Sequence, residues 1–142
     1  MALDNGHWAF ADMQMEPHKF CGFVYCIRHK SSGVMYFGRK NFLRQGAYAG
    51  YESNWRDYLS SSKKLQGWID VEGKSAFYFI VLDQYKTVGG LGYAETWTMM
   101  HARTPENPKR FLNKSVESVS WHSRESISER HISRLNHLLS VK

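Results

Sequence analysis

In the mostly apolar stretch at residues 22–28, G-F-V-Y-C-I-R, Phe23, Tyr25 and Ile27 alternate with Val24, Cys26 and Arg28, and this period of two predicts a β-strand. The residues S-S-G-V at 31–34 are typical of a turn, because Ser and Gly accept backbone angles that strand residues avoid. Tyr36 then lies in a second strand, which runs directly into Gly38, Arg39 and Lys40. We therefore expect an aromatic β-hairpin in residues 22–40, and the rest of the chain is organised around it.

A second apolar run, A-F-Y-F-I-V-L-D-Q-Y at residues 76–85, predicts a third strand. Because nearly every position in it is apolar, we expect a central strand covered on both faces of the sheet. The residues T-V-G-G-L-G at 87–92 then indicate a flexible connection.

Two short helices are expected between the hairpin and the third strand. The first passes Trp55 and begins at Ser53 or Asn54, because both residue types cap helix N-termini. The second turns two apolar side chains, Leu65 and Ile69, toward the core. It ends at the glycine at position 73, the residue type that most often ends a helix.

Two further helices are expected after the third strand. One begins near Tyr93, carries Glu95 and ends near His101, before a Pro-containing segment. The last begins with a capping box formed by Ser126 and Glu129, and its apolar residues recur at helical spacing.

The order strand, strand, helix, helix, strand, helix, helix indicates an α+β fold. We expect a small, three-stranded, mostly antiparallel sheet flanked by helices, plus a C-terminal helix. A chain of 142 residues is most simply one core. We expect an N-terminal arm at 1–19 that packs Trp8 and Phe10 on the core, a main domain at 20–114, and a helical extension at 115–142 packed on that domain.

The charge distribution points to a polyanionic partner. The formal net charge is +6, and residues 19–44 hold six basic side chains and no acidic one. A basic face of this kind favours nucleic acid, and a 15% share of aromatic residues also suits stacking on bases. The expected DNA-binding side chains are Arg28, Lys30, Arg44, Lys63, Lys64, Arg130 and Arg134.

Several classes of protein are disfavoured by the sequence. No apolar run approaches the roughly 18 residues of a membrane span, and the N-terminus lacks the pattern of a secretory signal. Cys21 and Cys26 would point to opposite faces of one strand and cannot bridge, so we expect a reducing compartment, the cytoplasm. The sequence has no phosphate-binding G-x-x-x-x-G-K-[ST] loop, no nucleophile elbow and no C-x-x-C pair, so a nucleotide cofactor, acyl transfer and a structural zinc are unsupported.

Four features follow one another in a recognisable order. They are F-V-Y at 23–25, Y-F-G at 36–38, a helical Glu95, and Leu112–Asn113 eighteen residues after Glu95. This order resembles the GIY-YIG nuclease family over about residues 22–114. The stretches Y-F-G-R-K-N-F, W-R-D-Y-L-S-S-S-K-K-L and Y-A-E are similar to a phage-encoded subgroup, the Seg-type homing endonucleases.

The resemblance implies hydrolysis of DNA phosphodiesters with one divalent cation, Mg²⁺ or Mn²⁺, held by Glu95. Such chemistry needs an activated water and neutralisation of developing charge. Tyr25 corresponds to the tyrosine that acts on the water, as general base or as its orienter, and Tyr36 helps to shape the site and contact the phosphate. Gly38 either lets the DNA backbone approach or satisfies the geometry of the strand end. Cleavage would take place in the host-cell cytoplasm if a phage encodes the protein.

The family's arginine has no direct counterpart. Aligning Tyr58 with the family's histidine or tyrosine places Asn54 where the arginine is expected. The three candidates to clamp the scissile phosphate are Arg39, which we favour, Lys40 and Arg56. Asn113 corresponds to a late asparagine that supports the site structurally, as Tyr58 and Gly38 also do.

Two alternatives remain open from sequence alone. One is a nucleic-acid-binding protein of the same fold with weak or no cleavage, which the asparagine at position 54 favours. The other is a nicking or repair subunit that relies on a partner for specificity.

Overall fold

The computed structural model describes residues 4–9, 14–44, 50–114 and 125–141. Three antiparallel strands form one sheet in the order β2-β1-β3, which confirms the predicted α+β class. The strands are β1 (Gly22–His29), β2 (Met35–Asn41) and β3 (Phe77–Tyr85). The helices are α1 (Lys63–Glu72), α2 (Val88–Ala102) and α3 (Glu129–Ser140). No helix in these ranges is long and apolar enough to cross a membrane.

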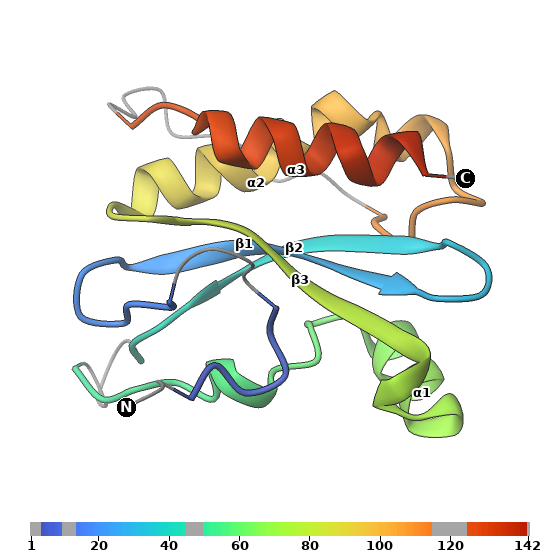
Figure 1. The fold of residues 1–142 in the computed structure, drawn as a ribbon, viewed down its shortest axis with the longest axis horizontal. Helices are drawn as coiled ribbons and strands as arrows, with labels where there is room; N and C mark the ends of the chain where they lie inside the picture. Colours follow the sequence, from blue (N-terminus) through green and yellow to red (C-terminus); the bar gives the residue numbers. More distant parts are fainter. Residues whose placement is uncertain (1–3, 10–13, 45–49, 115–124, 142) are drawn as a thin grey trace.

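The sheet lies between two layers (Figure 1). Helices α2 and α3 cover one face, whereas α1, the N-terminal arm and the segment before α1 cover the other. Strand β1 is central and buried along its whole length, and its alternating side chains feed two separate cores. Phe23, Tyr25 and Ile27 point into the core with α1, and Val24 and Cys26 point toward α2 and α3. The predicted alternation is therefore confirmed.

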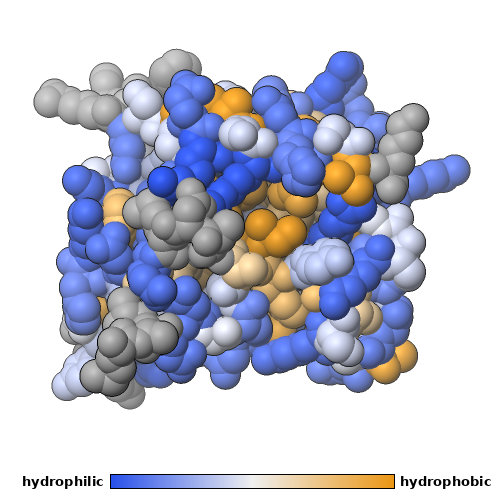
Figure 2. Space-filling model, in the orientation of Figure 1, coloured by the Kyte–Doolittle hydropathy of each residue, from blue (hydrophilic) through white to orange (hydrophobic). Residues whose placement is uncertain are grey.

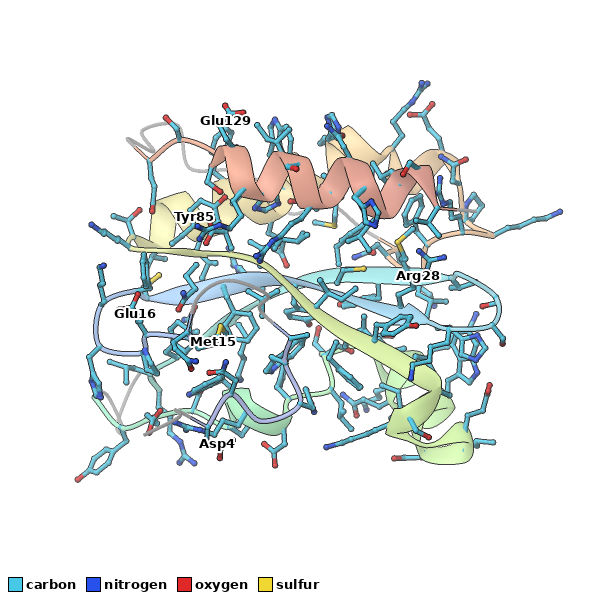
Figure 3. All side chains as sticks on the ribbon, viewed as in Figure 1. Asp4, Met15, Glu16, Arg28, Tyr85 and Glu129 are labelled. Atoms are coloured by element: carbon cyan, nitrogen blue, oxygen red, sulfur yellow. The ribbon has the colours of Figure 1, made fainter. Side chains whose placement is uncertain are left out.

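Side chains on β3 and on the arm show the same division into layers (Figure 3). Tyr85 points toward the helices α2 and α3, and Met15 lies against the opposite face. Strand β3 is an edge strand, so the prediction that it is central was wrong. The residues of β3 are mostly apolar because the layers on both faces of the sheet cover this edge strand. The arm pairs with the outer edge of β3, where the Ala9 amide donates to the Phe79 carbonyl at 2.8 Å.

The arm also contributes to the core that contains Tyr25. Trp8 is buried, and its indole nitrogen donates to the carbonyl of Trp55. The predicted contact of Phe10 lies outside the described residues, as does the predicted boundary between 114 and 115.

Three helix predictions differ from the structure, the first at α2. Helix α2 begins at Val88, because the Thr87 side chain caps it by accepting from the amide of Gly90. The Glu125 carboxylate reaches the same end and accepts from the Lys86 and Thr87 amides, at 2.9 and 3.1 Å. Gly90 leaves room for Glu125, because a Cβ there would collide with its side chain. The glycines thus belong to the helix and not to a flexible connection.

The predicted helix through Trp55 is a single 3-10 turn, Trp55–Asp57, and Asn54 makes no side-chain cap. Ser60 adopts a left-handed backbone (φ 82°), which ends any helical path before α1. The start of α1 is capped by Ser62, and Gly73 ends α1 as predicted. The N-cap of α3 is Ser128, two residues after the predicted Ser126.

A buried histidine fastens α3 to the rest of the fold. His131 Nδ1 lies 2.8 Å from the Tyr85 hydroxyl, and Nε2 lies 2.7 Å from the Thr98 hydroxyl. One ring thereby connects α3, β3 and α2. Burial lowers the pKa of His131 from 6.5 to about 3, with smaller contributions from two neighbouring basic side chains, Arg134 and His101.

We expect the free energy of unfolding to fall as the pH is lowered from about 6.5 toward 3. In that range the unfolded chain binds a proton at His131 and the folded chain does not, so stability rises with pH. The effect is on the order of a few kcal/mol. Urea unfolding at several pH values should show a shallower dependence for His131→Gln than for wild type. His137→Gln, an exposed change on the same helix, should keep the wild-type dependence. Equal slopes for His131→Gln and wild type would contradict the assignment.

Candidate functional site

The phenol of Tyr25 lies across β2 at a glycine. Tyr25 is paired with Gly38 in the sheet, and a Cβ at Gly38 would collide with the Tyr25 hydroxyl and ring. A register shift between Val24 and Tyr25 interrupts the pairing of β1 with β3, and such irregularities re-aim side chains. Gly38 therefore allows the Tyr25 side chain to reach the β2 edge, which gives the Y-F-G motif a steric reason within the protein.

Two other tyrosines surround the Tyr25 phenol. Its ring centroid lies 6.4 Å from that of Tyr36 and 6.2 Å from that of Tyr58. Tyr25 is only 1% exposed, and burial raises the pKa of its phenol well above the usual range. The two tyrosines and then Glu95 raise this pKa further. The Tyr25 hydroxyl is therefore protonated near neutral pH.

Tyr36, Gly38 and Lys40 follow one another on the same face of β2, because side chains alternate along a strand. The Tyr36 hydroxyl lies 3.4 Å from the Ser61 hydroxyl, and the Lys40 ammonium lies 4.0 Å from the centre of the Tyr58 ring. Burial lowers the pKa of Lys40, and the positive charge of Arg44 lowers it further. This row of side chains forms one wall of the candidate site.

Glu95 approaches from the other face of the sheet. It lies on α2, which packs against β1 and β2, and its side chain is 12% exposed. Its carboxylate Oε1 lies 3.7 Å from the Arg39 Nε. The Glu95 charge raises the pKa of both Tyr25 and Tyr58, and burial is the larger cause in each case. The carboxylate therefore lies within electrostatic range of the tyrosines, and the two faces meet at the β2 edge.

Gly92 is a residue of this site that the sequence analysis did not single out. A Cβ at Gly92 would collide with the Arg39 guanidinium, so a glycine one helical turn before Glu95 makes room for the Arg39–Glu95 pair. The available signal was the spacing G-x-x-E at residues 92–95, which begins at the last glycine of the segment interpreted as a flexible connection.

Arg56 lies in a different set of contacts. Its Nη1 donates to the Glu52 carboxylate at 3.0 Å, and its Nε donates to the Asp4 carbonyl at 2.9 Å. Its guanidinium also lies 4.3 Å from the centre of the Trp55 ring. These contacts hold Arg56 against the N-terminal arm, whereas Arg39 and Lys40 lie beside Glu95 and Tyr58 respectively.

At the outer edge of β2, the side chain of Asn113 makes the backbone hydrogen bonds that a neighbouring strand would otherwise make. Its Oδ1 accepts from the Phe37 amide at 2.9 Å, and its Nδ2 donates to the Phe37 carbonyl at 2.7 Å. Nδ2 also lies 3.4 Å from the sulfur of Met99 on α2. Asn113 thus ties the middle of β2 to α2, next to Gly38, and its supporting role at the site stays a prediction.

The predicted DNA-binding residues are divided among several surfaces. Lys63 and Lys64 are exposed in the first turn of α1, directly after its N-cap Ser62. Arg28 is only 8% exposed and offers little surface to a phosphate. The Lys30 ammonium lies 4.9 Å from the centre of the Tyr78 ring.

The two predicted arginines of α3 contact the strand beneath them. Arg130 lies 3.9 Å from the Asp83 carboxylate, and Arg134 donates to the Val81 carbonyl at 3.0 Å. Because α3 packs on β3, these side chains belong to the opposite edge of the sheet from Lys40 and Arg39.

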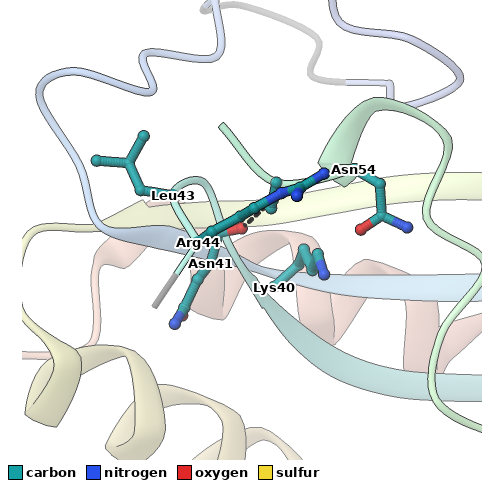
Figure 4. Close-up of a pocket in the computed structure, with 6 residues that line it drawn as sticks. Lys40, Asn41, Leu43, Arg44 and Asn54 are labelled. Carbon is teal, nitrogen blue, oxygen red and sulfur yellow. Dashed lines mark hydrogen bonds between the residues drawn. The ribbon is translucent and has the colours of Figure 1, made fainter. Parts of the chain in front are cut away.

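Two of the hollows in the described part of the chain lie beside the sheet. An apolar groove of about 480 Å³ lies between α3 and β3, and apolar side chains gather in the middle of that face (Figure 2). Its lining includes Ala9, Ile80, Val81 and Leu138. A polar pocket of about 430 Å³ adjoins the end of β2 and is lined by Lys40, Asn41, Leu43, Arg44, Ser53 and Asn54 (Figure 4). Only the second hollow shares a residue with the candidate site, Lys40.

The side chains at the β2 edge fit one divalent cation. Glu95 supplies one carboxylate, and a hard cation such as Mg²⁺ completes its shell with waters and phosphate oxygens. Within the described ranges no group of three or more His, Cys, Asp or Glu side chains forms an all-protein metal cage. A partly buried carboxylate beside protonated phenols is compatible with an ion that the substrate would help to hold.

A comparison with family models places this geometry in a family. The model described as "Putative endonuclease segE, GIY-YIG domain" matches residues 8–116. The match includes Tyr25, Tyr36, Glu95 and Asn113. Searches of curated proteins and of solved structures give no significant match. The matched segment covers most of the 142 residues, and the chain belongs to the SegE-type GIY-YIG family of DNA endonucleases.

Proposed function

We propose that the protein is a divalent-metal-dependent homing-type endonuclease that hydrolyses DNA phosphodiesters at the β2 edge. The observation that carries this proposal is the meeting of Glu95 with Arg39 and with the tyrosines at that edge. The family match supports the substrate class, and the resemblance to phage-encoded enzymes supports the homing role in the cytoplasm of an infected cell.

In this proposal Glu95 binds the cation, which is Mg²⁺ or Mn²⁺. A bound divalent cation polarises the phosphate and makes a nucleophilic hydroxide accessible near neutral pH. Helix α2 holds the Glu95 carboxylate at the sheet edge, and partial burial strengthens its attraction for a cation. The ion pair with Arg39 keeps a second charged group at the same place.

Tyr25 orients the attacking water by hydrogen bonding. Its raised pKa makes it a poor proton acceptor by itself, so the structure favours the orienting role over that of an independent general base. Gly38 fixes the position of the phenol, and the ring of Tyr36 limits its movement. Tyr36, hydrogen-bonded to Ser61, contacts the phosphate from the side.

Arg39 is the proposed clamp on the scissile phosphate. Its side chain is 38% exposed and lies beside the carboxylate that binds the cation, so a phosphate bound there would face both positive groups. Lys40 is the second candidate side chain for contacting the phosphate, and it lies on the face of the sheet that carries Tyr25 and Tyr58. Arg56 is the third candidate for this clamp, because its contacts with Glu52 and Asp4 already engage its guanidinium.

We expect Glu95→Ala to reduce cleavage of supercoiled plasmid by at least about 10²-fold, because it removes the carboxylate that binds the cation. EDTA should abolish wild-type cleavage, and Mg²⁺ should restore it. Glu106→Ala is a matched control at an exposed position, where the carboxylate pairs with Arg103. Cleavage that persists in Glu95→Ala would overturn the metal assignment. DNA binding without cleavage in any divalent metal would favour a binding protein that keeps the fold.

Gly38→Ala should reduce cleavage by about 10²-fold, because the new methyl group displaces the Tyr25 phenol from its position over β2. The comparison is Gly67→Ala on the exposed face of α1, where a Cβ meets nothing within 4 Å. That change should stabilise the protein by up to about 1 kcal/mol and leave cleavage unchanged. Circular dichroism melting and plasmid cleavage measure the two effects. Wild-type cleavage by Gly38→Ala would show that the position of Tyr25 does not limit the reaction.

A further inference from the structure

We infer that the polar pocket beside Lys40 and Arg44 binds the backbone phosphate next to the scissile one, so that the cleaved strand runs along β2. The inference rests on the proposed nuclease function and adds a phosphate subsite to it. The pocket comprises the end of β2, the residues that follow it and the Ser53–Asn54 segment facing them.

The lining of this pocket is suited to an anion. Lys40 and Arg44 bring two positive charges to it, and Asn41, Ser53 and Asn54 bring neutral polar side chains. No carboxylate is among the described residues that line it. The neighbouring Glu52 carboxylate accepts from Arg56 and from the Trp55 indole, both at 3.0 Å. Figure 4 shows the ends of Lys40, Arg44 and Asn54 on the same side of the pocket.

The positive charges of Lys40 and Arg44, which line the same pocket, repel each other. The Lys40 side chain also covers the Tyr58 ring, and its partial burial disfavours the charged form. Both effects lower the pKa of Lys40, the burial more than the charge of Arg44. A bound phosphate would relieve the repulsion, because one anion interacts favourably with both cations.

The walls of the pocket are fixed by hydrogen bonds to the backbone. The Ser53 amide donates to the Phe42 carbonyl and the Arg44 amide donates to the Tyr51 carbonyl, both at 2.7 Å. The Ser53 hydroxyl donates to the Asn41 carbonyl at 2.6 Å. These bonds hold the two segments together before any ligand arrives, which lowers the entropic cost of binding.

The distance from the site fits a neighbouring phosphate. Gly38, which lies under the Tyr25 phenol, and Lys40 are two residues apart on the same face of β2. Two strand residues span roughly 6.6 Å, a distance comparable to that between successive phosphates of one DNA strand. A strand whose scissile phosphate lies at Gly38 would therefore place its next phosphate at the mouth of the pocket.

Binding of a fluorescent 20-base-pair duplex in EDTA tests the pocket without cleavage. Each phosphate contact adds about one unit to the slope of log Kd against log salt concentration. Arg44→Gln should lower that slope by about one unit and weaken binding by roughly three- to ten-fold. Arg44→Lys keeps the charge and should keep the slope. Arg103→Gln removes the same charge at an exposed position beyond α2 and should change neither quantity.

A negative charge introduced into the pocket gives a second comparison. Asn54→Asp and Asn107→Asp each add one negative charge at an exposed asparagine, and only Asn54 lines the pocket. Asn54→Asp should weaken binding by about ten-fold or more, and Asn107→Asp by less than about two-fold. Equal weakening by the two variants, or an unchanged slope in Arg44→Gln, would overturn the inference and leave the proposed function standing. Wild-type protein that binds no duplex would overturn both.

The position of the phosphate is tested once the cleavage site is mapped on plasmid. A duplex with one uncharged methylphosphonate beside the scissile phosphate should bind wild type about three- to ten-fold more weakly than the unmodified duplex. The same substitution should add no further loss to Arg44→Gln, because that variant has already lost the contact. If the methylphosphonate and Arg44→Gln weaken binding additively, whichever side of the scissile phosphate carries the methylphosphonate, the pocket does not bind the neighbouring phosphate.

Discussion

The contact between the Tyr25 phenol and Gly38 is the constraint on which the site depends. Because β2 has no side chain at this position, a tyrosine from the central strand can lie across it and reach the sheet edge. Trp8 and Tyr58 pack around the same ring, which excludes water from it and raises its pKa. The steric requirement of one glycine thus determines both the position and the protonation state of the phenol.

The site lies at an edge because both faces of the sheet are occupied. One layer packs the tyrosines against β2, and the other layer contains Glu95 on α2. Side chains from these opposite faces of the sheet can therefore approach each other at its β2 edge. Asn113 pairs with Phe37 at that edge and ties it to α2. The polar pocket at one end of β2 adjoins the same edge, and in the proposed arrangement the DNA strand follows this edge.

Local chemistry predicted most elements correctly but not their place in the sheet. The period-two pattern of residues 23–28 and the helical positions of Leu65 and Ile69 depend on which face is buried, which a sequence expresses directly. The apolar run of β3 indicated burial on both faces, and burial does not distinguish an edge strand from a central one. The start of α2 was missed because Gly90 accommodates Glu125, which is 35 residues away in the chain.

The sequence alone determined the family, the α+β class and the identity of Tyr25, Tyr36, Glu95 and Asn113 as members of one order of motifs, because these depend on residue type and spacing. Only the tertiary structure distinguished the surroundings of the three basic side chains proposed to contact the phosphate. Arg39, Lys40 and Arg56 are all cationic candidates in the sequence, and the roles proposed for them rest on their different contacts. Contacts with Glu95, with the Tyr58 ring and with Glu52 separate them, and each contact joins residues distant in the chain or on different elements.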